Sequence, residues 1–317
     1  MTLSMREPMP AQAQIREVGL RDGLQSLSRV MPTEFKCNWI RQAYEAGMRE
    51  MEVVSFVPPR LLPQMADSVE VVAFAKTLPG LQVCSLVPNV KGAERAIEAG
   101  ADLLILPISA SFAHSQANVR KTPDEMIDNV RAIVEARNAA GAATRLEAGI
   151  GTAFGCALQG EVKESEVLRL AEAALEAGAD CISLADTVGY ANPAQVRRLF
   201  RQVFEIAGDR FVCGHFHDTR GLGLVNVLAA LDVGMTRFDA SLAGIGGCPF
   251  APGATGNVAT EDVVFMLNSM GIDTGIDLEA LLKVRAWVGG PLEGESLRGA
   301  IHQAGLPKNY KSVPSAA

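Results

Sequence analysis

The segment 96-AIEAGADLLILPIS-109 joins the end of a helix to a complete β-strand. Residues 96–99 are good helix formers, Gly100 suits the left-handed position that follows a helix, and the run 103–108 is apolar. A strand that is apolar at every position is buried on both faces, as in a parallel sheet covered by helices. The segment therefore predicts a helix that leads through a short link into a buried parallel strand.

The same pattern occurs three more times, in 43-AYEAGMREMEVVSF-56, 174-ALEAGADCISLAD-186 and 230-ALDVGMTRFDASLAG-244. A weaker copy surrounds Gly141, and three more strands come from 15-IREVGLRDG-23, 81-LQVCSLVPN-89 and 210-RFVCGHFHD-218. The eight expected strands cover residues 14–19, 51–56, 82–87, 103–108, 144–150, 181–185, 211–216 and 237–242. Eight buried strands separated by helix-length crossovers predict an α/β fold, the (β/α)8 TIM barrel. An open doubly wound sheet is the alternative, but no G-x-G-x-x-G follows the first strand.

We expect one catalytic domain over residues 1–317, since no linker or low-complexity tract divides the chain. The barrel is expected over about 14–270, and extra C-terminal helices over about 276–305. A length of 317 residues with 48% hydrophobic content is ample for one large core.

Composition and charge exclude several classes of protein. A formal net charge of −7 opposes binding to nucleic acid or to an anionic membrane surface. The N-terminus has no apolar signal region, and no apolar run is long enough to span a membrane. The six cysteines form no CxxC pair, so we expect reduced thiols and a cytoplasmic protein.

Two of the four histidines, His215 and His217, lie two residues apart at the end of the seventh expected strand. Residues at i and i+2 of a strand point to the same face, and barrel enzymes carry their chemistry at the carboxyl ends of the strands. Asp22 follows the first strand and Asn257 follows the eighth, so both fall near the same mouth. Two imidazoles, a carboxylate and an amide oxygen predict a metal site.

This donor set contains no thiolate, which favours octahedral Mg²⁺ or Mn²⁺ over a closed zinc site, although Zn²⁺ or Co²⁺ is not excluded. A chance His-x-His pair is the alternative for the histidines. For Asn257, the alternative is an ordinary helix N-cap.

Arg21 directly precedes Asp22, and adjacent residues at a strand end are expected to diverge into the barrel mouth and its rim. A guanidinium beside a divalent cation stabilises an enolate or a carboxylate. The alternative is a structural ion pair with Glu52 or Asp186, which are acidic groups on otherwise apolar strands.

The loop 243-AGIGGCPFAPGATGN-257 is rich in glycine and carries a single thiol, Cys248. Such a loop over the barrel mouth suits a lid that brings Cys248 to the substrate. The alternative is a phosphate-binding loop in which Cys248 has no role.

Five stretches of the chain together resemble the 3-hydroxy-3-methylglutaryl-CoA lyase family of metal-dependent lyase barrels. They are 17-EVGLRDGLQS-26, 52-EVVSFVPPRLLPQM-65, 183-SLADTVG-189, 215-HFHDTRGLGLVN-226 and 244-GIGGCPFAPGATGNVATEDVVFML-267. The resemblance runs without a break from about residue 15 to residue 275. R-D-G-L-Q combined with G-G-C-P-F marks the lyase branch, whereas His-x-His alone marks the wider superfamily.

The resemblance implies a set of functional residues. The implied metal ligands are Asp22, His215, His217 and Asn257; the implied catalytic groups are Arg21, Asp22, His215, Cys248, Glu52, Asp186 and Glu261. We expect Arg21, Gly149, Gly151 and Thr187 to contact the substrate. The implied cofactor is Mg²⁺ or Mn²⁺, and the implied assembly is a homodimer.

The implied reaction is a retro-Claisen cleavage of a 3-hydroxy-acyl-CoA, of the kind used in leucine degradation. The tertiary hydroxyl loses its proton to Asp22 or His215, the adjacent carbon–carbon bond breaks, and Arg21 stabilises the acyl-CoA enolate. Cys248 or His215 then returns a proton to carbon.

Departures from the family pattern concentrate in the fifth strand. The chain has 149-GIGTAFGCALQG-160, where the family commonly has tyrosine and serine in place of Gly149 and Gly151. Ala157 and Leu158 likewise replace a proline and a tyrosine. The leading substrate is 3-hydroxy-3-methylglutaryl-CoA, cleaved to acetyl-CoA and acetoacetate. Citramalyl-CoA and 3-hydroxy-3-isohexenylglutaryl-CoA are the competing substrates, because lost side chains reshape a pocket.

Three other classes compete with this reading. A condensing acyltransferase of the isopropylmalate or homocitrate synthase type would run the chemistry in reverse, but it usually carries an additional region. An aldolase acting on a keto acid would not require CoA. A non-catalytic binding protein would not need Arg21, Asp22, both histidines and Asn257 together.

Overall fold

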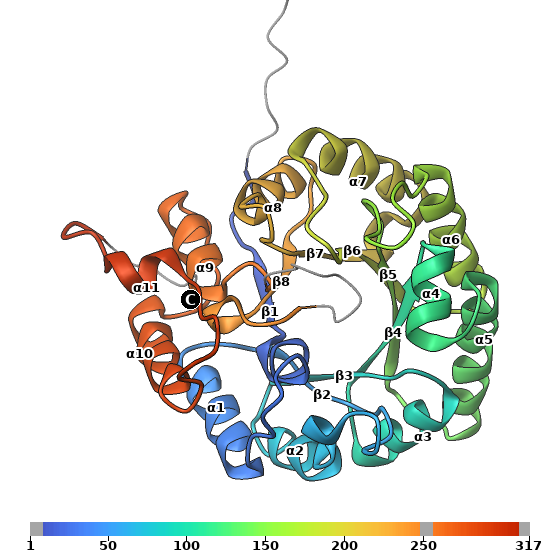
Figure 1. Ribbon diagram of the computed structural model, residues 1–317, viewed down its shortest axis with the longest axis horizontal. Helices are drawn as coiled ribbons and strands as arrows, with labels where there is room; N and C mark the ends of the chain where they lie inside the picture. Colours follow the sequence, from blue (N-terminus) through green and yellow to red (C-terminus); the bar gives the residue numbers. More distant parts are fainter. Residues whose placement is uncertain (1–8, 248–255, 311–317) are drawn as a thin grey trace, which may run out of the picture.

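The computed structural model describes residues 9–247 and 256–310, which form a closed barrel of eight parallel strands (Figure 1). The strands are β1 (Gln14–Glu17), β2 (Glu50–Ser55), β3 (Gln82–Leu86), β4 (Leu103–Ser109), β5 (Arg145–Gly151), β6 (Cys181–Asp186), β7 (Phe211–Phe216) and β8 (Arg237–Ala240). Their order around the barrel follows the chain, and β1 pairs in parallel with both β2 and β8. The predicted (β/α)8 barrel is confirmed.

Helices surround the ring of strands, as Figure 1 shows. They are α1 (Thr33–Glu45), α2 (Ser68–Ala75), α3 (Val90–Ala99), α4 (Phe112–Val119), α5 (Pro123–Ala139), α6 (Glu164–Glu176), α7 (Pro193–Ala207), α8 (Gly223–Leu231), α9 (Thr260–Ser269), α10 (Leu278–Gly289) and α11 (Ala300–Ala304). The two helices expected after the barrel are α10 and α11. Helix α10 packs on α1 and α9, and the ring of Trp287 stacks on Phe35 with centroids 5.0 Å apart.

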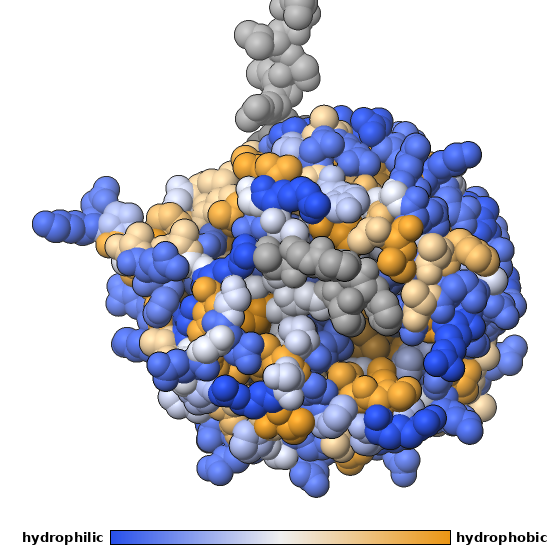
Figure 2. All heavy atoms as spheres, in the orientation of Figure 1, coloured by the Kyte–Doolittle hydropathy of each residue, from blue (hydrophilic) through white to orange (hydrophobic). Residues whose placement is uncertain are grey.

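Helix α7 shows how the outer layer packs on the sheet. In α7, Val196, Leu199, Phe200 and Val203 are buried at the i, i+3, i+4, i+7 spacing of one helix face. Asn192 begins this helix by accepting a hydrogen bond from a backbone amide of the first turn. The outline of the molecule is mostly hydrophilic, and apolar side chains gather around the centre of the face shown in Figure 2. No helix in the described ranges has the length and apolarity that a membrane crossing requires.

The glycines of the repeated segment end their helices as expected. Gly47, Gly100, Gly178 and Gly234 have φ values of 102°, 89°, 98° and 101°. A residue with a Cβ rarely adopts such angles, so these positions favour glycine.

Two strands end two residues earlier than predicted. Strand β1 was expected to reach residue 19 and ends at Glu17; β8 was expected to reach residue 242 and ends at Ala240. In both cases tight helical turns replace the last strand residues: a π-helical turn η1 (Gly19–Gly23) and a 3-10 turn η4 (Leu242–Gly244). Both turns lie at the carboxyl ends of the strands, and η1 carries two of the predicted site residues.

Candidate active site

The turn η1 brings Arg21 and Asp22 to the carboxyl end of β1. The amide of Asp22 donates to the carbonyl oxygen of Val18 at 2.7 Å, and the turn packs closely against its surroundings. A Cβ on Gly19 would lie 2.6 Å from Oε1 of Glu17, so only glycine fits at that position. The expectation that Arg21 and Asp22 diverge at a strand end is wrong. The residues belong to a turn, and their side chains meet.

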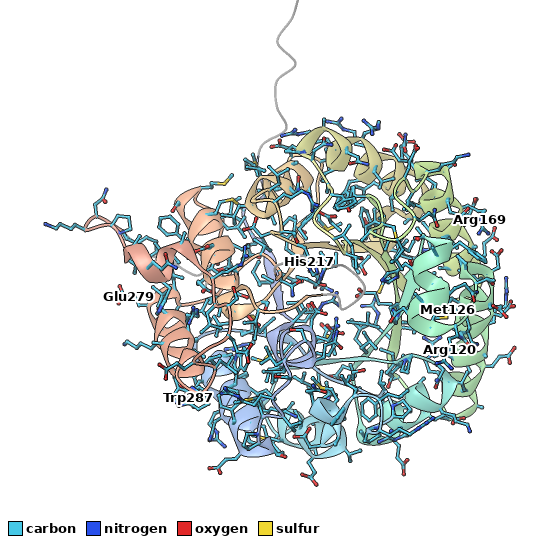
Figure 3. All side chains as sticks on the ribbon, in the orientation of Figure 1. Arg120, Met126, Arg169, His217, Glu279 and Trp287 are labelled. Carbon is cyan, nitrogen blue, oxygen red and sulfur yellow. The ribbon has the colours of Figure 1, made fainter. Side chains whose placement is uncertain are left out.

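The histidine pair contributes to the same cluster. His215 lies in β7, and His217 follows this strand and forms an isolated backbone bridge with Asn257. The ligand atoms of Asp22, His215 and His217 all lie within 4.8 Å of one another. Figure 3 shows His217 near the centre of the barrel. The structure therefore brings together two imidazoles and one carboxylate that the chain holds almost 200 residues apart.

Asn257 completes this cluster from the loop after β8. Its Nδ2 donates to Oδ2 of Asp22 at 2.7 Å and to the carbonyl oxygen of Ile245 at 3.1 Å. Its Oδ1 is buried and has no hydrogen-bond partner among the described residues. Helix α9 begins at Thr260 and is preceded by Ala259, so the N-cap alternative for Asn257 is wrong. An unpaired amide oxygen beside a carboxylate and two imidazoles fits a divalent cation with oxygen and nitrogen ligands.

The surroundings shift the pKa values of Asp22, His215 and His217 in different directions. Burial favours the neutral acid of Asp22, but the charges of Arg21 and the two histidines lower its pKa. Burial and the charge of His215 lower the pKa of His217 to about 4. For His215, burial is outweighed by the hydrogen bond and charge of Asp239, which raise its pKa. His217 is thus held neutral, as a metal ligand must be.

Arg21 forms two short ion pairs. Its Nη2 lies 2.6 Å from Oε2 of Glu52, and its Nη1 lies 2.6 Å from Oδ1 of Asp22. Glu52 and Asp186 were the two expected structural partners of Arg21, and Glu52 is the one that pairs with it. Burial raises the pKa of Glu52 although Arg21 opposes the shift. The two pairs fix the position of the guanidinium beside Asp22.

Asp186 makes different contacts from those expected for a partner of Arg21. Its carboxylate oxygens accept hydrogen bonds from the amides of Tyr190 at 2.8 Å and Ala191 at 3.1 Å. Burial raises its pKa to about 6. Asp186 therefore anchors the loop after β6, and the alternative of an ion pair between Asp186 and Arg21 is wrong. Thr187, next in the chain, accepts a hydrogen bond from the amide of Thr152 at 2.8 Å.

Strand β5 carries no side chain at two positions near its carboxyl end. Gly149 and Gly151 are both partly exposed, although they lie in a strand at the centre of the molecule. A Cβ on Gly149 would lie 3.4 Å from Oγ of Ser183, which is ordinary contact, and a Cβ on Gly151 would lie 3.3 Å from Oγ1 of Thr187. The wall of the barrel mouth at β5 is thus formed by backbone.

Glu261, one of the predicted catalytic groups, stands apart from the cluster. Glu261 lies in the first turn of α9, where it accepts hydrogen bonds from the amide of Ala243 and from Nε of Arg285, both at 3.1 Å. These contacts join α10 to the end of β8, and burial raises the pKa of Glu261 to about 7. Cys248 and its proposed lid lie outside the described residues.

Sequence reasoning did not select Arg16 or Asp239, which lie beneath the cluster. Both are charged and buried inside the barrel. Asp239 lies 3.0 Å from Nδ1 of His215. Burial opposes ionisation of Asp239, but Arg16 and His215 lower its pKa far below the ordinary range. The criterion that selected Glu52, an acidic group on an apolar strand, would also have selected Asp239.

Comparison with known proteins agrees with this site. The family model described as HMGL-like matches residues 12–288. The hydroxymethylglutaryl-CoA lyase YngG of Bacillus subtilis (strain 168) is 39% identical over 295 residues, covering 92% of this chain and 98% of the relative. The mitochondrial hydroxymethylglutaryl-CoA lyase of Bos taurus is 37% identical over 279 residues, covering 88% of this chain and 85% of the relative.

A solved structure has the same barrel. An HMG-CoA lyase from Acinetobacter baumannii, in complex with coenzyme A and 3-methylmalate, superimposes with a TM-score of 0.89 and 40% identity. The alignment covers 96% of this chain and 98% of that one. Identity at this level over nearly the whole length establishes common descent and function class, whereas a barrel by itself would establish only the fold. This protein belongs to the HMGL-like family, within the hydroxymethylglutaryl-CoA lyases.

Proposed function

We propose that this protein is a carbon–carbon lyase that cleaves 3-hydroxy-3-methylglutaryl-CoA to acetyl-CoA and acetoacetate. The observation that carries the proposal is the convergence of Asp22, His215 and His217 within 4.8 Å, beside Arg21, in a member of this family. The related enzyme solved with coenzyme A supports an acyl-CoA as the substrate.

We assign metal binding to Asp22, His215, His217 and Asn257, with Mg²⁺ or Mn²⁺ as the ion. When bound, such an ion lowers the cost of removing a proton from a hydroxyl group. Asp22 or His215 accepts that proton. The unpaired Oδ1 of Asn257 is the fourth donor.

Arg21 is assigned to the enolate. When the carbon–carbon bond breaks, an electron pair moves toward the thioester, and its oxygen becomes negatively charged. A fixed guanidinium stabilises this charge without having to reorganise during the reaction. Glu52 keeps the guanidinium in place through the 2.6 Å ion pair. The return of a proton to carbon is assigned, from the motifs, to Cys248 or to His215.

A second candidate substrate is favoured by β5. Gly149 and Gly151 are partly exposed, and backbone forms the wall there. We propose that this wall admits a substituent larger than methyl at the carbinol carbon, as in 3-hydroxy-3-isohexenylglutaryl-CoA. Thr187 lies beside Gly151 and is assigned to substrate contact.

A panel of acyl-CoAs assayed with Mg²⁺ or Mn²⁺ tests the function. The panel contains hydroxymethylglutaryl-CoA, citramalyl-CoA and isohexenylglutaryl-CoA, and mass spectrometry identifies the products. Acetyl-CoA plus acetoacetate from the first compound supports the proposal. Cleavage of one of the other two compounds, without cleavage of hydroxymethylglutaryl-CoA, would make that compound the substrate. Activity only on a keto acid that carries no CoA would reveal an aldolase.

The assembly and location are also proposals. We expect a homodimer in the cytoplasm, which is the common arrangement for a soluble enzyme of this kind. Light scattering of the purified full chain tests the dimer, and fractionation of the source cells tests the location.

A further inference from the structure

Asp239 is a buried carboxylate that accepts three hydrogen bonds and contacts a ring nitrogen of His215. Its Oδ1 accepts from Nε of Arg16 at 2.7 Å and from Sγ of Cys213 at 3.2 Å. Its Oδ2 accepts from Nη2 of Arg16 at 3.1 Å and lies 3.0 Å from Nδ1 of His215. Both oxygens are therefore occupied, and the fork of Arg16 fixes the plane of the carboxylate.

Arg16 is held just as firmly from its other side. Its Nη1 and Nη2 donate to the two carboxylate oxygens of Glu147 at 2.8 and 3.0 Å. Oγ of Ser183 donates to Glu147 at 2.6 Å. The network joins five strands, from β1 through β5 and β6 to β7 and β8, and its charged side chains are buried. Because rigid strands carry every member, the position of Asp239 is set by the barrel itself.

This arrangement decides where the proton of His215 lies. A carboxylate bound by the Arg16 fork and by a thiol can only accept, so the hydrogen of its contact with the imidazole belongs to Nδ1. Nε2 then keeps its lone pair for the cluster with Asp22 and His217. For His217, by contrast, Nδ1 is buried and has no hydrogen-bond partner among the described residues.

We propose that Asp239, clamped by Arg16, is a positioning residue that fixes the tautomer and ring orientation of His215 for the reaction. The two members of the His-x-His pair are thus unequal: His215 is preorganised by the barrel, whereas no carboxylate in the described part of the chain orients His217 through Nδ1. The inference deepens the proposed function, on which its catalytic meaning rests. The tautomer itself can be measured independently of activity.

Nitrogen NMR of the full-length protein labelled with ¹⁵N-histidine tests the tautomer directly, because the chain has only four histidines. Single His→Gln variants assign the signals. In the metal-free wild type at pH 8 we expect His215 to carry a proton on Nδ1. A wild-type His215 protonated only on Nε2 would overturn the proposal.

Two matched variants separate positioning from mere support of the core. Asp239→Asn can turn its amide toward His215 as a donor, which disfavours a proton on Nδ1. Glu147→Gln alters the second carboxylate that is hydrogen-bonded to Arg16. Among the described residues Glu147 bonds to Arg16 and Ser183 and to no histidine, so this variant tests the buried network alone.

We expect Asp239→Asn to shift the His215 signals and to weaken Mn²⁺ binding by about 10- to 100-fold. Glu147→Gln should leave the His215 signals in place and change Mn²⁺ affinity by less than about twofold. Mn²⁺ binding is followed by electron paramagnetic resonance, and thermal unfolding of both variants reports the structural cost. Equal effects of the two variants on Mn²⁺ and on the tautomer would reduce Asp239 to core support.

The outcome is distinguishable from that of the proposed function. If wild-type protein cleaves none of the acyl-CoAs but shows the expected tautomer and Mn²⁺ affinities, the positioning role stands and the assigned reaction fails. If it cleaves hydroxymethylglutaryl-CoA and Asp239→Asn alters neither tautomer nor Mn²⁺ binding, the reaction stands and the positioning role fails.

Discussion

Arg21 and Asp22 are consecutive in the chain, yet Nη1 of the arginine lies 2.6 Å from Oδ1 of the aspartate. This contact exists because both residues belong to the turn η1, where neighbouring side chains can converge, and not to a strand, where they alternate. The second ion pair of Arg21, with Glu52, adds a tether from β2. A permanent cation is thereby fixed next to the residues assigned to the metal.

Replacing Arg21 by Gln should remove the stabilisation of the enolate. We expect kcat for hydroxymethylglutaryl-CoA to fall by about 100-fold or more, because one fixed donor to a developing negative charge contributes that much in other enzymes. Mn²⁺ affinity should remain or increase, because Asp22 loses a competing cation. Steady-state kinetics and Mn²⁺ titration measure the two effects separately.

Arg21→Lys is the matched control, since it retains a positive charge but loses the fork that spans Asp22 and Glu52. It should recover part of the lost kcat. Full activity of Arg21→Gln would remove Arg21 from the mechanism, and loss of both activity and Mn²⁺ binding would point to collapse of the turn.

Metal removal should abolish cleavage, and added Mg²⁺ or Mn²⁺ should restore it.

Asn257→Ala removes the unpaired oxygen and the hydrogen bond to Asp22, so we expect Mn²⁺ to bind about 10- to 100-fold more weakly. Asn268→Ala is the control, because Asn268 is a buried asparagine of α9 that bonds to Tyr310. Similar Mn²⁺ affinities in both variants would exclude Asn257 as a ligand.

Gly149→Val should narrow the substrate pocket. A Cβ at this position lies 3.4 Å from Ser183 and 3.6 Å from Ile105, so the added methyl groups must extend away from these two side chains, on the partly exposed side of β5. We expect kcat/KM for isohexenylglutaryl-CoA to fall by about 10-fold or more, with a smaller fall for hydroxymethylglutaryl-CoA. Competition between the two substrates in one reaction measures the ratio. An unchanged ratio would show that Gly149 does not face the substituent.

Glu17 should make the protein less stable as the pH rises from 4.5 to 7. Burial raises its pKa from 4.5 to about 7, against hydrogen bonds from Thr260 and from the amides of Leu242 and Gly19. The folded state therefore binds more protons than the unfolded state in this window, so stability present below pH 4.5 is lost as the pH passes 7. The full effect is on the order of 3 kcal/mol, from about 1.4 kcal/mol per pKa unit.

Glu17→Gln has no charge to titrate, so its free energy of unfolding should lack this slope. Urea unfolding between pH 5.5 and 7.5 compares the variant with wild type. Glu125→Gln is the control of opposite sign: the hydrogen bonds from Thr122 lower the pKa of Glu125, and its contribution is lost only in acid. Parallel pH profiles for wild type and Glu17→Gln would contradict the assignment.

Local sequence determined the barrel. The repeated helix, glycine and apolar strand specify each αβ unit from interactions close in the chain, so the eight strands could be placed within one or two residues. The predicted strands also showed which polar residues follow a strand end. These residues could be assigned to one mouth, because parallel strands in a closed barrel direct all their carboxyl ends to one side. That geometry explains why His215, His217, Asp22 and Asn257 could be selected together.

Only the tertiary structure decided how these groups pair. The sequence left Glu52 and Asp186 as equal partners for Arg21; the structure pairs Arg21 with Glu52 and binds Asp186 to backbone amides. Asn257 was ambiguous between a ligand and a helix cap until the helix start was known. The choice depends on distances of a few ångströms between residues far apart in sequence, which no local pattern encodes. The network of Arg16, Glu147 and Asp239 forms for the same reason: strands β1, β5 and β8 must first come together around a common interior before its charges can meet.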